Sequence, residues 1–187
     1  MCQQKIRAGE MKKVWVMINK TLLKIIVLFP LFFILSCSNN SNDQVMEKVG
    51  AQIDSGFELP NLDGQEVNIS NYKGKYILIN FWATWCKPCV RELPSLENLQ
   101  SNFNAENFEI IAIHIGQTKD QVRSFLIEQG ITLNVLIDED ITLSNWMVEA
   151  IPTTFLVNKE GIVEYRYVGE KDWGSESVIS FIQSKIN

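Results

Sequence analysis

Two cysteines, Cys86 and Cys89, are separated by two residues and stand between an apolar run and a segment with helical spacing. A disulfide closes over so short a span only where the backbone turns tightly, as in the first turn of a helix. There the unpaired N–H groups and the positive end of the helix dipole favour a thiolate over a thiol. A thiolate attacks disulfides, and a second thiol close by resolves the mixed disulfide. The pair therefore predicts thiol–disulfide exchange.

The same spacing has two other interpretations. A zinc site needs about four ligands, and the other candidates are Cys2, Cys37 and His114, of which both cysteines fall in a predicted export segment. A purely structural disulfide would stabilise the fold only weakly, because so short a loop removes little chain entropy. We expect redox chemistry, with no metal and no cofactor beyond the Cys86–Cys89 disulfide.

Residues 1–36 have the composition of a signal peptide rather than of a folded element. Lysines precede an apolar stretch over residues 25–35, which is shorter than the roughly 20 residues that span a bilayer. The stretch ends in Ile34-Leu35-Ser36-Cys37. This sequence resembles the bacterial lipobox, in which the cysteine is lipidated and becomes the new N-terminus. We therefore expect export, with Cys37 as the lipidation site.

Three segments follow from this interpretation. Residues 1–36 are the signal peptide, residues 37–50 a polar flexible tether, and residues 51–187 one folded domain. Met11, which two lysines follow, is a better translation start than Met1. The alternative is an uncleaved N-terminal membrane anchor. Both interpretations place the domain in the cell envelope, on the periplasmic side of the membrane.

The charge of the predicted domain excludes some partners. The chain has 17 basic and 22 acidic residues; residues 1–36 hold six and one of these, so the remainder has 11 and 21, a net charge of −10. Nucleic acid rewards clustered Lys and Arg, and anionic lipid attracts basic segments. We expect no nucleic-acid partner, and membrane attachment through the lipid anchor alone.

Hydrophobic spacing predicts the elements that must position the cysteines. The predicted strands cover residues 57–59, 66–69, 76–82, 108–115, 133–137, 153–157 and 162–168, and the predicted helices follow Cys86 and cover 119–129, about 143–148 and about 175–186. Asp63-Gly64 marks a hairpin that leads the domain. Strands and helices alternate and a hairpin closes the sheet, so we predict an α/β fold with a mixed central sheet flanked by helices.

Three motifs together look like a thioredoxin fold: Phe81-Trp82-Ala83-Thr84-Trp85-Cys86-Lys87-Pro88-Cys89, Pro94, and Ile151-Pro152-Thr153-Thr154-Phe155. Three further features narrow the family within this fold: the leading hairpin, the αβ insertion over 119–137 and the continuation Cys89-Val90-Arg91-Glu92. They resemble the TlpA/ResA-like thiol–disulfide oxidoreductases, which are membrane-tethered reductases of the bacterial cell envelope. The resemblance covers roughly residues 50–187.

The resemblance implies roles for the residues of these motifs. Cys86 is expected to be the exposed nucleophile and Cys89 the buried resolving thiol. Pro88 fixes the turn between them, and Trp85 shields Cys86 and offers apolar contact to partners. The Ile151-Pro152 bond is expected to be cis, although most X-Pro bonds are trans. This loop would face the cysteines and pair the Ile151 backbone with the substrate.

Proton transfer has one candidate residue. Thioredoxins place a buried Asp under the resolving cysteine, and the matching residue here is Asn80, which cannot titrate. Glu92 lies three residues after Cys89 on the same helix face, and ResA-like proteins carry a functional glutamate at that spacing. The alternative is a solvated charge near the helix N-terminus. Glu92 is therefore the candidate for acid–base work.

The remaining aromatic residues and the one histidine have structural interpretations. Trp82 is expected to pack beneath the cysteine loop, and Trp146 and Trp173 to be core or rim residues. His114 lies in a predicted strand with no second metal ligand nearby, so we expect it to be structural as well.

These features predict a tethered reductase that reduces disulfides of exported proteins. The chain has no nucleotide-binding motif, so the electrons are expected to come from a membrane thiol carrier. In the family the substrate is often apocytochrome c. One alternative is a peroxiredoxin-like thiol peroxidase, although the Pro expected ahead of its cysteine is absent. The other is a lipoprotein that uses the scaffold only for binding, against which the intact cysteines argue.

Overall fold

The computed structural model describes residues 45–51, 57–142, 146 and 148–186. Cys37, the predicted signal peptide and most of the predicted tether and of the helix at 143–148 lie outside these residues. The elements are β1 (Glu47–Ala51), β2 (Glu58–Pro60), β3 (Glu66–Asn68), the 3-10 helix η2 (Ile69–Tyr72), β4 (Tyr76–Trp82), α2 (Lys87–Ser101), β5 (Phe108–Ile115), α3 (Lys119–Gln129), β6 (Asn134–Asp138), β7 (Thr153–Val157), β8 (Val163–Val168) and α4 (Glu176–Ile186).

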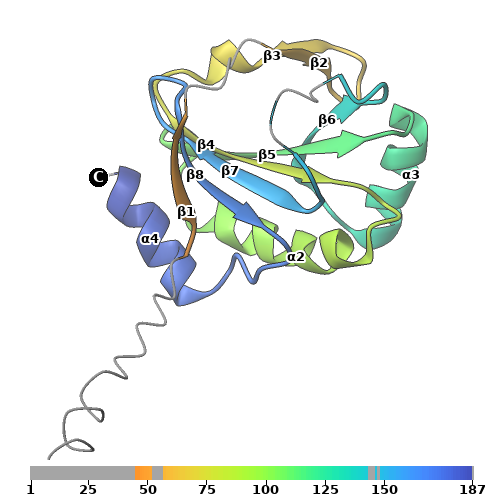
Figure 1. The fold of residues 1–187 in the computed structure, drawn as a ribbon. Coiled ribbons are helices and arrows are strands. Elements are labelled where there is room, and N and C mark those ends of the chain that lie inside the picture. The colour runs from red at the N-terminus through yellow and green to blue at the C-terminus, as the bar shows by residue number, and fades with distance from the viewer. Residues whose placement is uncertain (1–44, 52–56, 143–145, 147, 187) are drawn as a thin grey trace, which may run out of the picture. The chain divides into compact units, whose positions relative to one another are not determined.

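The described strands form a six-stranded mixed sheet and a separate hairpin. The sheet order is β1-β8-β7-β4-β5-β6, and the hairpin pairs β2 with β3. β4, β5 and β6 run parallel, whereas β7 is antiparallel to β4 and β8 to β7 (Figure 1). The predicted α/β fold, the hairpin and the αβ insertion are confirmed. Because β4, β5 and β6 are parallel, the segments that follow them meet at one edge of the sheet, and the cysteines follow β4.

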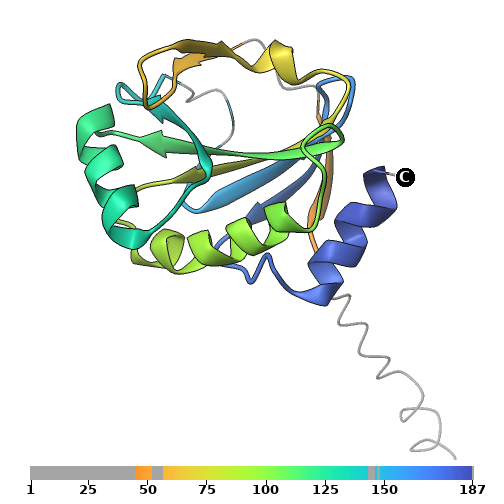
Figure 2. The ribbon, with the colours of Figure 1, turned by 180° about the vertical axis from the view of Figure 1, so that it is seen from behind.

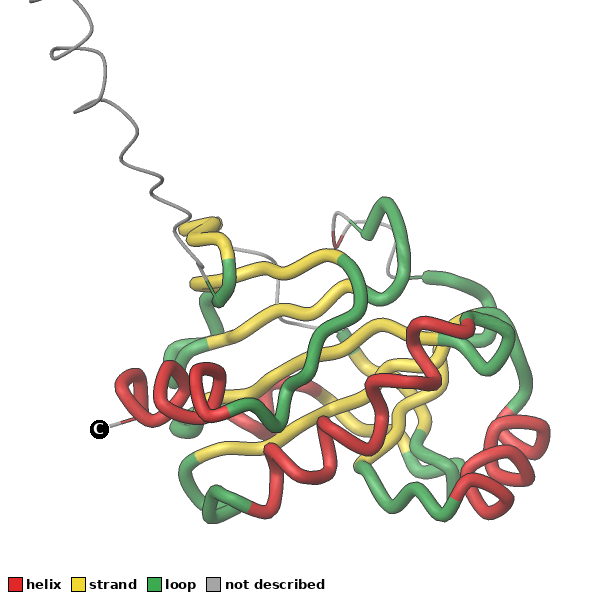
Figure 3. The backbone as a smooth tube through the Cα atoms, turned by 90° about the horizontal axis from the view of Figure 1, so that it is seen from below, coloured by secondary structure: helices red, strands yellow, loops and turns green. Residues whose placement is uncertain are grey.

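The side chains of β4 are buried on both faces of the sheet, as its continuous apolar sequence predicts. Leu78 and Trp82 belong to the core under the helices, with residues of α2 and α4. Ile77, Ile79 and Phe81 point to the other face and pack with the hairpin and Trp146. The hairpin lies on one side of the sheet and α2 on the other (Figures 1 and 2), and α2 and α4 cross the same face (Figure 3).

The sheet begins earlier than the sequence predicts. Residues 37–50 were expected to be a tether, but β1 begins at Glu47 and pairs antiparallel with β8. Met46, just before β1, is 1% exposed and belongs to the core under the helices. The sequence Glu-Lys-Val-Gly-Ala gives little strand signal, because polar residues and Gly are depleted in strands. Pairing with β8 and the burial of Met46 override that weak propensity.

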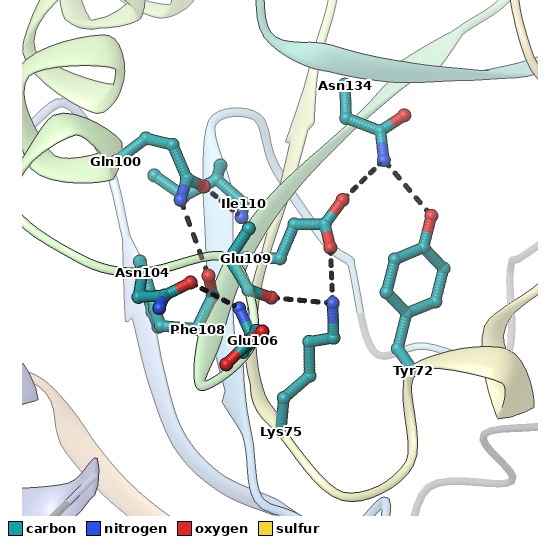
Figure 4. A network of polar contacts seen from close by, with 10 residues as sticks. Tyr72, Lys75, Gln100, Asn104, Glu106, Phe108, Glu109, Ile110 and Asn134 are labelled. Carbon is teal, nitrogen blue, oxygen red and sulfur yellow. Dashed lines mark hydrogen bonds and ion pairs between the residues drawn. The ribbon is translucent and has the colours of Figure 1, made fainter.

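A polar network fixes the beginning of β5 (Figure 4). β6 pairs with β5 only from Ile111 onward. The Gln100 side chain of α2 takes the place of a strand before that point: its Oε1 accepts from the N–H of Ile110 at 2.7 Å, and its Nε2 donates to the carbonyl of Phe108 at 3.4 Å. These bonds hold the C-terminal end of α2 against β5, so they also orient the helix whose other end carries the cysteines.

A second part of this network joins η2 and the residue before β4 to β5 and β6. Lys75 pairs with Glu109 at 2.8 Å, and Asn134 donates to Glu109 and to the Tyr72 hydroxyl at 2.9 and 3.0 Å. The pKa of Tyr72 is raised, mainly because the phenol is partly buried. The phenol therefore stays protonated at neutral pH, and its oxygen accepts this bond through a lone pair.

Met46→Ala tests whether the segment before residue 51 belongs to the domain. Removing a buried Met side chain leaves a cavity, so we expect a loss of about 2–5 kcal/mol in the free energy of unfolding. Urea denaturation of the protein starting at residue 38 measures it. Lys48→Ala is the matched control, because Lys48 is an exposed residue of β1. Its free energy of unfolding should change by no more than about 0.5 kcal/mol. Equal midpoints for the two variants would contradict the assignment.

Candidate active site

Cys86 and Cys89 form a disulfide at the beginning of α2. The two sulfurs are 2.04 Å apart and the Cα atoms 5.3 Å. Cys86 is the N-cap, and its Sγ accepts from the N–H of Cys89 at 3.3 Å. Pro88 lies in the first turn of the helix. Backbone N–H groups there have no partner within the helix, so the N–H that Pro lacks costs no hydrogen bond. The structure thus confirms that the pair opens the helix, where the helix dipole favours a thiolate.

The prediction of an exposed Cys86 is wrong for the oxidised pair. Cys86 is 6% exposed and Cys89 is fully buried. The sulfur of Cys86 is bonded inward to Cys89, and it lies 3.8 Å from the carbonyl oxygen of Ile151 on the opposite loop. Cys86 is nevertheless the more accessible of the two sulfur-bearing residues.

The loop opposite the disulfide contains a cis peptide bond, as expected, between Ile151 and Pro152. It leads directly into β7, which pairs with β4. The carbonyl of Pro152 accepts from the N–H of Gly169 at 2.8 Å, which ties the loop to the end of β8. The structure therefore brings Cys86, Ile151 and Pro152 together, although 65 residues separate the first two.

Trp85 presents an open apolar surface beside the disulfide. Its side chain is 64% exposed. It was expected both to shield Cys86 and to offer contact to partners, and this exposure supports the second role. Trp82, by contrast, is fully buried beneath the loop, as predicted.

His114 supports the cysteine loop from β5. It lies opposite Trp82 with the rings 4.8 Å apart at 88°, and its Nε2 accepts from the N–H of Thr84 at 3.1 Å. Burial lowers the pKa of His114 to about 4, so the imidazole stays neutral and its Nε2 keeps the lone pair that this bond needs. The structural role predicted for His114 is confirmed, and its contact with Thr84 places it two residues from Cys86.

Glu92 is buried on α2, so the alternative of a solvated charge is wrong. It is 2% exposed. Its Oε1 accepts from Asn80 Nδ2 at 2.8 Å, and its Oε2 accepts from the Lys171 N–H and from Trp173 Nε1, both at 3.1 Å. Burial raises the pKa of Glu92 to about 7, against the lowering effect of these three bonds. A carboxyl that titrates near neutrality can both give and take a proton.

Comparisons with known proteins identify the family. The model of the AhpC/TSA family matches residues 49–166. "Thiol-disulfide oxidoreductase ResA" of Geobacillus thermodenitrificans is 34% identical over 155 residues, which cover 82% of this chain and 88% of that protein. The chain belongs to the ResA-like thiol–disulfide oxidoreductases of the AhpC/TSA family. ResA of Bacillus subtilis is 38% identical over 108 residues, 57% of this chain and 60% of that protein.

Solved structures show the same fold as this ResA-like oxidoreductase. The thioredoxin domain of a thiol-disulfide oxidoreductase from Bacteroides vulgatus superposes with a TM-score of 0.62 at 20% identity, over 76% of this chain and 98% of that one. StoA from Bacillus subtilis superposes with a TM-score of 0.59 at 21% identity, over 73% and 100%. These likenesses establish the thioredoxin-like fold. The relatives named ResA, rather than these fold likenesses, argue against the alternative of a binding protein without catalytic activity.

The ResA-like site has two residues whose contacts the sequence did not reveal. Trp173 was expected to be a core or rim residue, and it is buried, but its indole N–H also binds the Glu92 carboxylate. Asn80 donates to Glu92 and to Thr154 Oγ1 at 2.9 Å, so it joins β4 to α2 and to β7. No local pattern around Trp173 could have shown this, because the two partners lie 81 residues apart.

A pocket opens beside Glu92. It has a volume of about 440 Å³ and is lined by Arg91, Glu92, Ser95, Glu170, Lys171 and Asp172. The guanidinium of Arg91 pairs with Glu170 at its rim. Arg91 is 59% exposed, so this pair contributes little to stability. The pocket gives the otherwise buried carboxyl a neighbouring polar surface.

The described part of the ResA-like chain has neither a metal centre nor a spanning helix. Within it, no three His, Cys, Asp or Glu side chains are grouped so that they could hold a metal ion. None of its helices is both long and apolar enough to cross a membrane.

Glu92 should make the stability of the oxidised protein depend on pH. Its pKa is 4.5 when unfolded and about 7 when folded, so folding binds a proton between these values. The resulting stability is fully present below pH 4.5 and is lost as the pH rises through 7. The difference of about 2.5 pKa units corresponds to about 3 kcal/mol.

Urea unfolding of the oxidised protein between pH 4.5 and 8 measures this change. Glu92→Gln removes the titration, so its stability should change less over the same range. The difference between the two curves isolates Glu92 from other titrating groups such as His114. Parallel curves would contradict the raised pKa.

Proposed function

We propose that this oxidoreductase works as a reductase of disulfides in exported proteins. The reduced pair gives two electrons to the substrate: Cys86 attacks one sulfur and releases the other as a thiol. Cys89 then attacks Cys86 and releases the second substrate thiol, which leaves the Cys86–Cys89 disulfide. The observation that carries this proposal is that disulfide at the start of α2, opposite the cis-Pro152 loop.

The geometry supports Cys86 as the nucleophile and Cys89 as the resolving thiol. Cys86 stands at the helix N-cap, where the N–H of Cys89 points at its sulfur and would stabilise a thiolate. Cys89 is fully buried one turn further on. A substrate therefore meets Cys86 first, and Cys89 attacks only from inside the protein.

Glu92 is the proposed proton carrier for the resolving step. Cys89 must lose its proton before it can attack, and Asn80 cannot accept one. Glu92 lies three residues along the same helix, titrates near pH 7 and borders the pocket between Arg91 and Lys171. These properties together, rather than burial alone, support the proposed role.

The substrate segment is proposed to lie along Ile151 and Trp85. The Ile151 carbonyl, 3.8 Å from Cys86 Sγ, can pair with an extended backbone, with Pro152 fixing the turn of that loop. Trp85 offers an apolar surface on the other side, and Pro88 shapes the turn that brings Cys86 forward. Trp85, Pro88, Ile151 and Pro152 are thus the proposed binding residues.

Location and partners complete the proposal. The signal peptide over 1–36 and a lipid on Cys37 would hold the domain on the periplasmic side of the membrane. A membrane thiol carrier would re-reduce the disulfide, and an apocytochrome c, whose cysteines must be kept reduced, is the proposed substrate. The relatives named ResA support this class of activity. The Pro that a peroxidase would need ahead of its cysteine is absent, which argues against the peroxidase alternative.

Cys89→Ser should trap the substrate. Without the resolving thiol, the mixed disulfide at Cys86 persists, so a periplasmic extract should yield covalent complexes that dithiothreitol releases. Non-reducing electrophoresis and mass spectrometry detect them. Cys86→Ser is the matched control and should yield none. Complexes on Cys86→Ser in place of Cys89→Ser would reverse the two roles.

The equilibrium reduction potential tests the direction. A value near or below about −230 mV, in the range of thioredoxin, makes the protein a reductant. It can be measured in glutathione and dithiothreitol buffers with Trp fluorescence as the readout. A value near about −120 mV would make the protein a disulfide donor and would overturn the reductive direction.

A further inference from the structure

The exposed apolar side chains gather at the edge that carries the disulfide. Among the described residues, four large apolar side chains are markedly exposed: Trp85, Ile127, Ile141 and Val168. Trp85 follows β4, Ile141 follows β6, and Val168 ends β8 opposite Thr153 of the cis-proline segment. Only Ile127, on α3, belongs to another part of the surface.

Ile141 has a backbone conformation that isoleucine avoids. Its φ is 54°, and among the described residues it is the only one other than glycine with a positive φ. A β-branched residue is an outlier there, and Gly, Asn or Asp would cost less. The side chain is 54% exposed, so core packing does not explain the choice. Strain that persists without a packing benefit is typical of binding sites.

The neighbouring residues hold Ile141 in place. Asp138, which is 1% exposed, accepts from both the N–H and the hydroxyl of Thr142 at 2.7 and 2.9 Å. The Asp138 carbonyl accepts from the N–H of Gly116 at 3.0 Å, and a Cβ on Gly116 would lie 3.8 Å from Ile141 Cδ1. The backbone around Ile141 is therefore held by hydrogen bonds to Asp138, and its side chain lies near the end of β5.

A chain of contacts connects this position to the cysteine loop. Gln117 follows Gly116, and its Oε1 accepts from the hydroxyl of Thr84, next to Trp85. Neighbouring strands lie about 4.8 Å apart, so the end of β6 lies about 10 Å from the end of β4. An extended chain covers that distance in about three residues.

We propose that Ile141 is a specificity residue, which binds an apolar side chain of the substrate about three residues from the cysteine under attack. The proposal rests on the reductase function above and specifies its substrate: an extended segment with an apolar residue at that spacing. Such a segment would run from Ile151 past Cys86 and Trp85 to Ile141. Glu139 and Asp140, both exposed and next to Ile141, would disfavour acidic residues beside it.

Peptide disulfides test this directly. The probes are Ser/Gly peptides without acidic residues, and their one cysteine is disulfide-bonded to glutathione. Each peptide carries a single Leu at one position before or after the cysteine, and the position changes from peptide to peptide. The reference peptide has Ser in place of Leu. The protein is reduced with dithiothreitol and freed of it. One turnover then oxidises Cys86 and Cys89 and releases the peptide thiol and glutathione, and its second-order rate constant is measured.

We expect Leu about three residues from the cysteine to raise the rate about fivefold over Ser. Ile141→Asn should bring this ratio close to one, because the apolar contact is gone. The same variant should raise the urea midpoint, since Asn accepts a positive φ more readily than Ile. Ile127→Asn, which is 74% exposed on α3, is the matched control and should keep the wild-type ratio.

Each failure has its own signature. A Leu preference that survives in Ile141→Asn, or equal wild-type rates for Leu and Ser at every position, overturns the role of Ile141 and leaves the reductase function standing. A wild-type protein that reduces none of these disulfides, the Ser peptides included, overturns the reductase function and the specificity with it.

Discussion

A buried carboxylate on the helix of the cysteines constrains much of this structure. A charge can be buried only where hydrogen bonds replace its lost water. Glu92 meets that requirement with donors from three places: Asn80 on β4, the backbone of Lys171 and the indole of Trp173. Ser95, one turn along α2, adds a bond from the Trp173 N–H. The helix, the central strand and the segment after β8 are thereby held in one arrangement.

This arrangement separates the part of the site that holds the disulfide from the part that is proposed to bind the substrate. The rigid side is formed by β4, α2 and β5, which fix the disulfide from below through Trp82 and His114. The proposed recognition side consists of loops at the same sheet edge, contributed by the segments after β4 and β6 and before β7. Loops on a rigid scaffold can vary in sequence without moving the cysteines. Substrate preference can therefore change while the redox pair stays in place.

The sequence predicted those features whose signals are local. The apolar run of β4, the helix opened by Cys86 and the hairpin at Asp63-Gly64 were all predicted, because periodicity and turn residues act over a few positions. The cis bond before Pro152 and the candidate Glu92 came from family resemblance. The residues that Pro152 and Glu92 contact lie far away along the chain, so no local pattern marks either role.

What the sequence could not show depends on tertiary contacts. β1 was missed because Glu47 and Lys48 resemble tether residues until β8 pairs with them. The burial of Glu92 was left open because a carboxylate on a helix surface is usually solvated. Its three hydrogen-bond donors, from Asn80, Lys171 and Trp173, come from parts of the chain outside α2. The positive φ of Ile141 has no signature, since the sequence has Ile where Gly or Asn would have marked it.

The Gln100 side chain at the start of β5 has a consequence for the behaviour of the protein in a crowded compartment. The backbone groups of Phe108 and Ile110 that precede the pairing with β6 would otherwise be an open template for a strand of another molecule. Gln100 occupies both of them from within the same chain. One amide thus closes this stretch of strand edge, so that neither group is left to pair with a strand of another molecule.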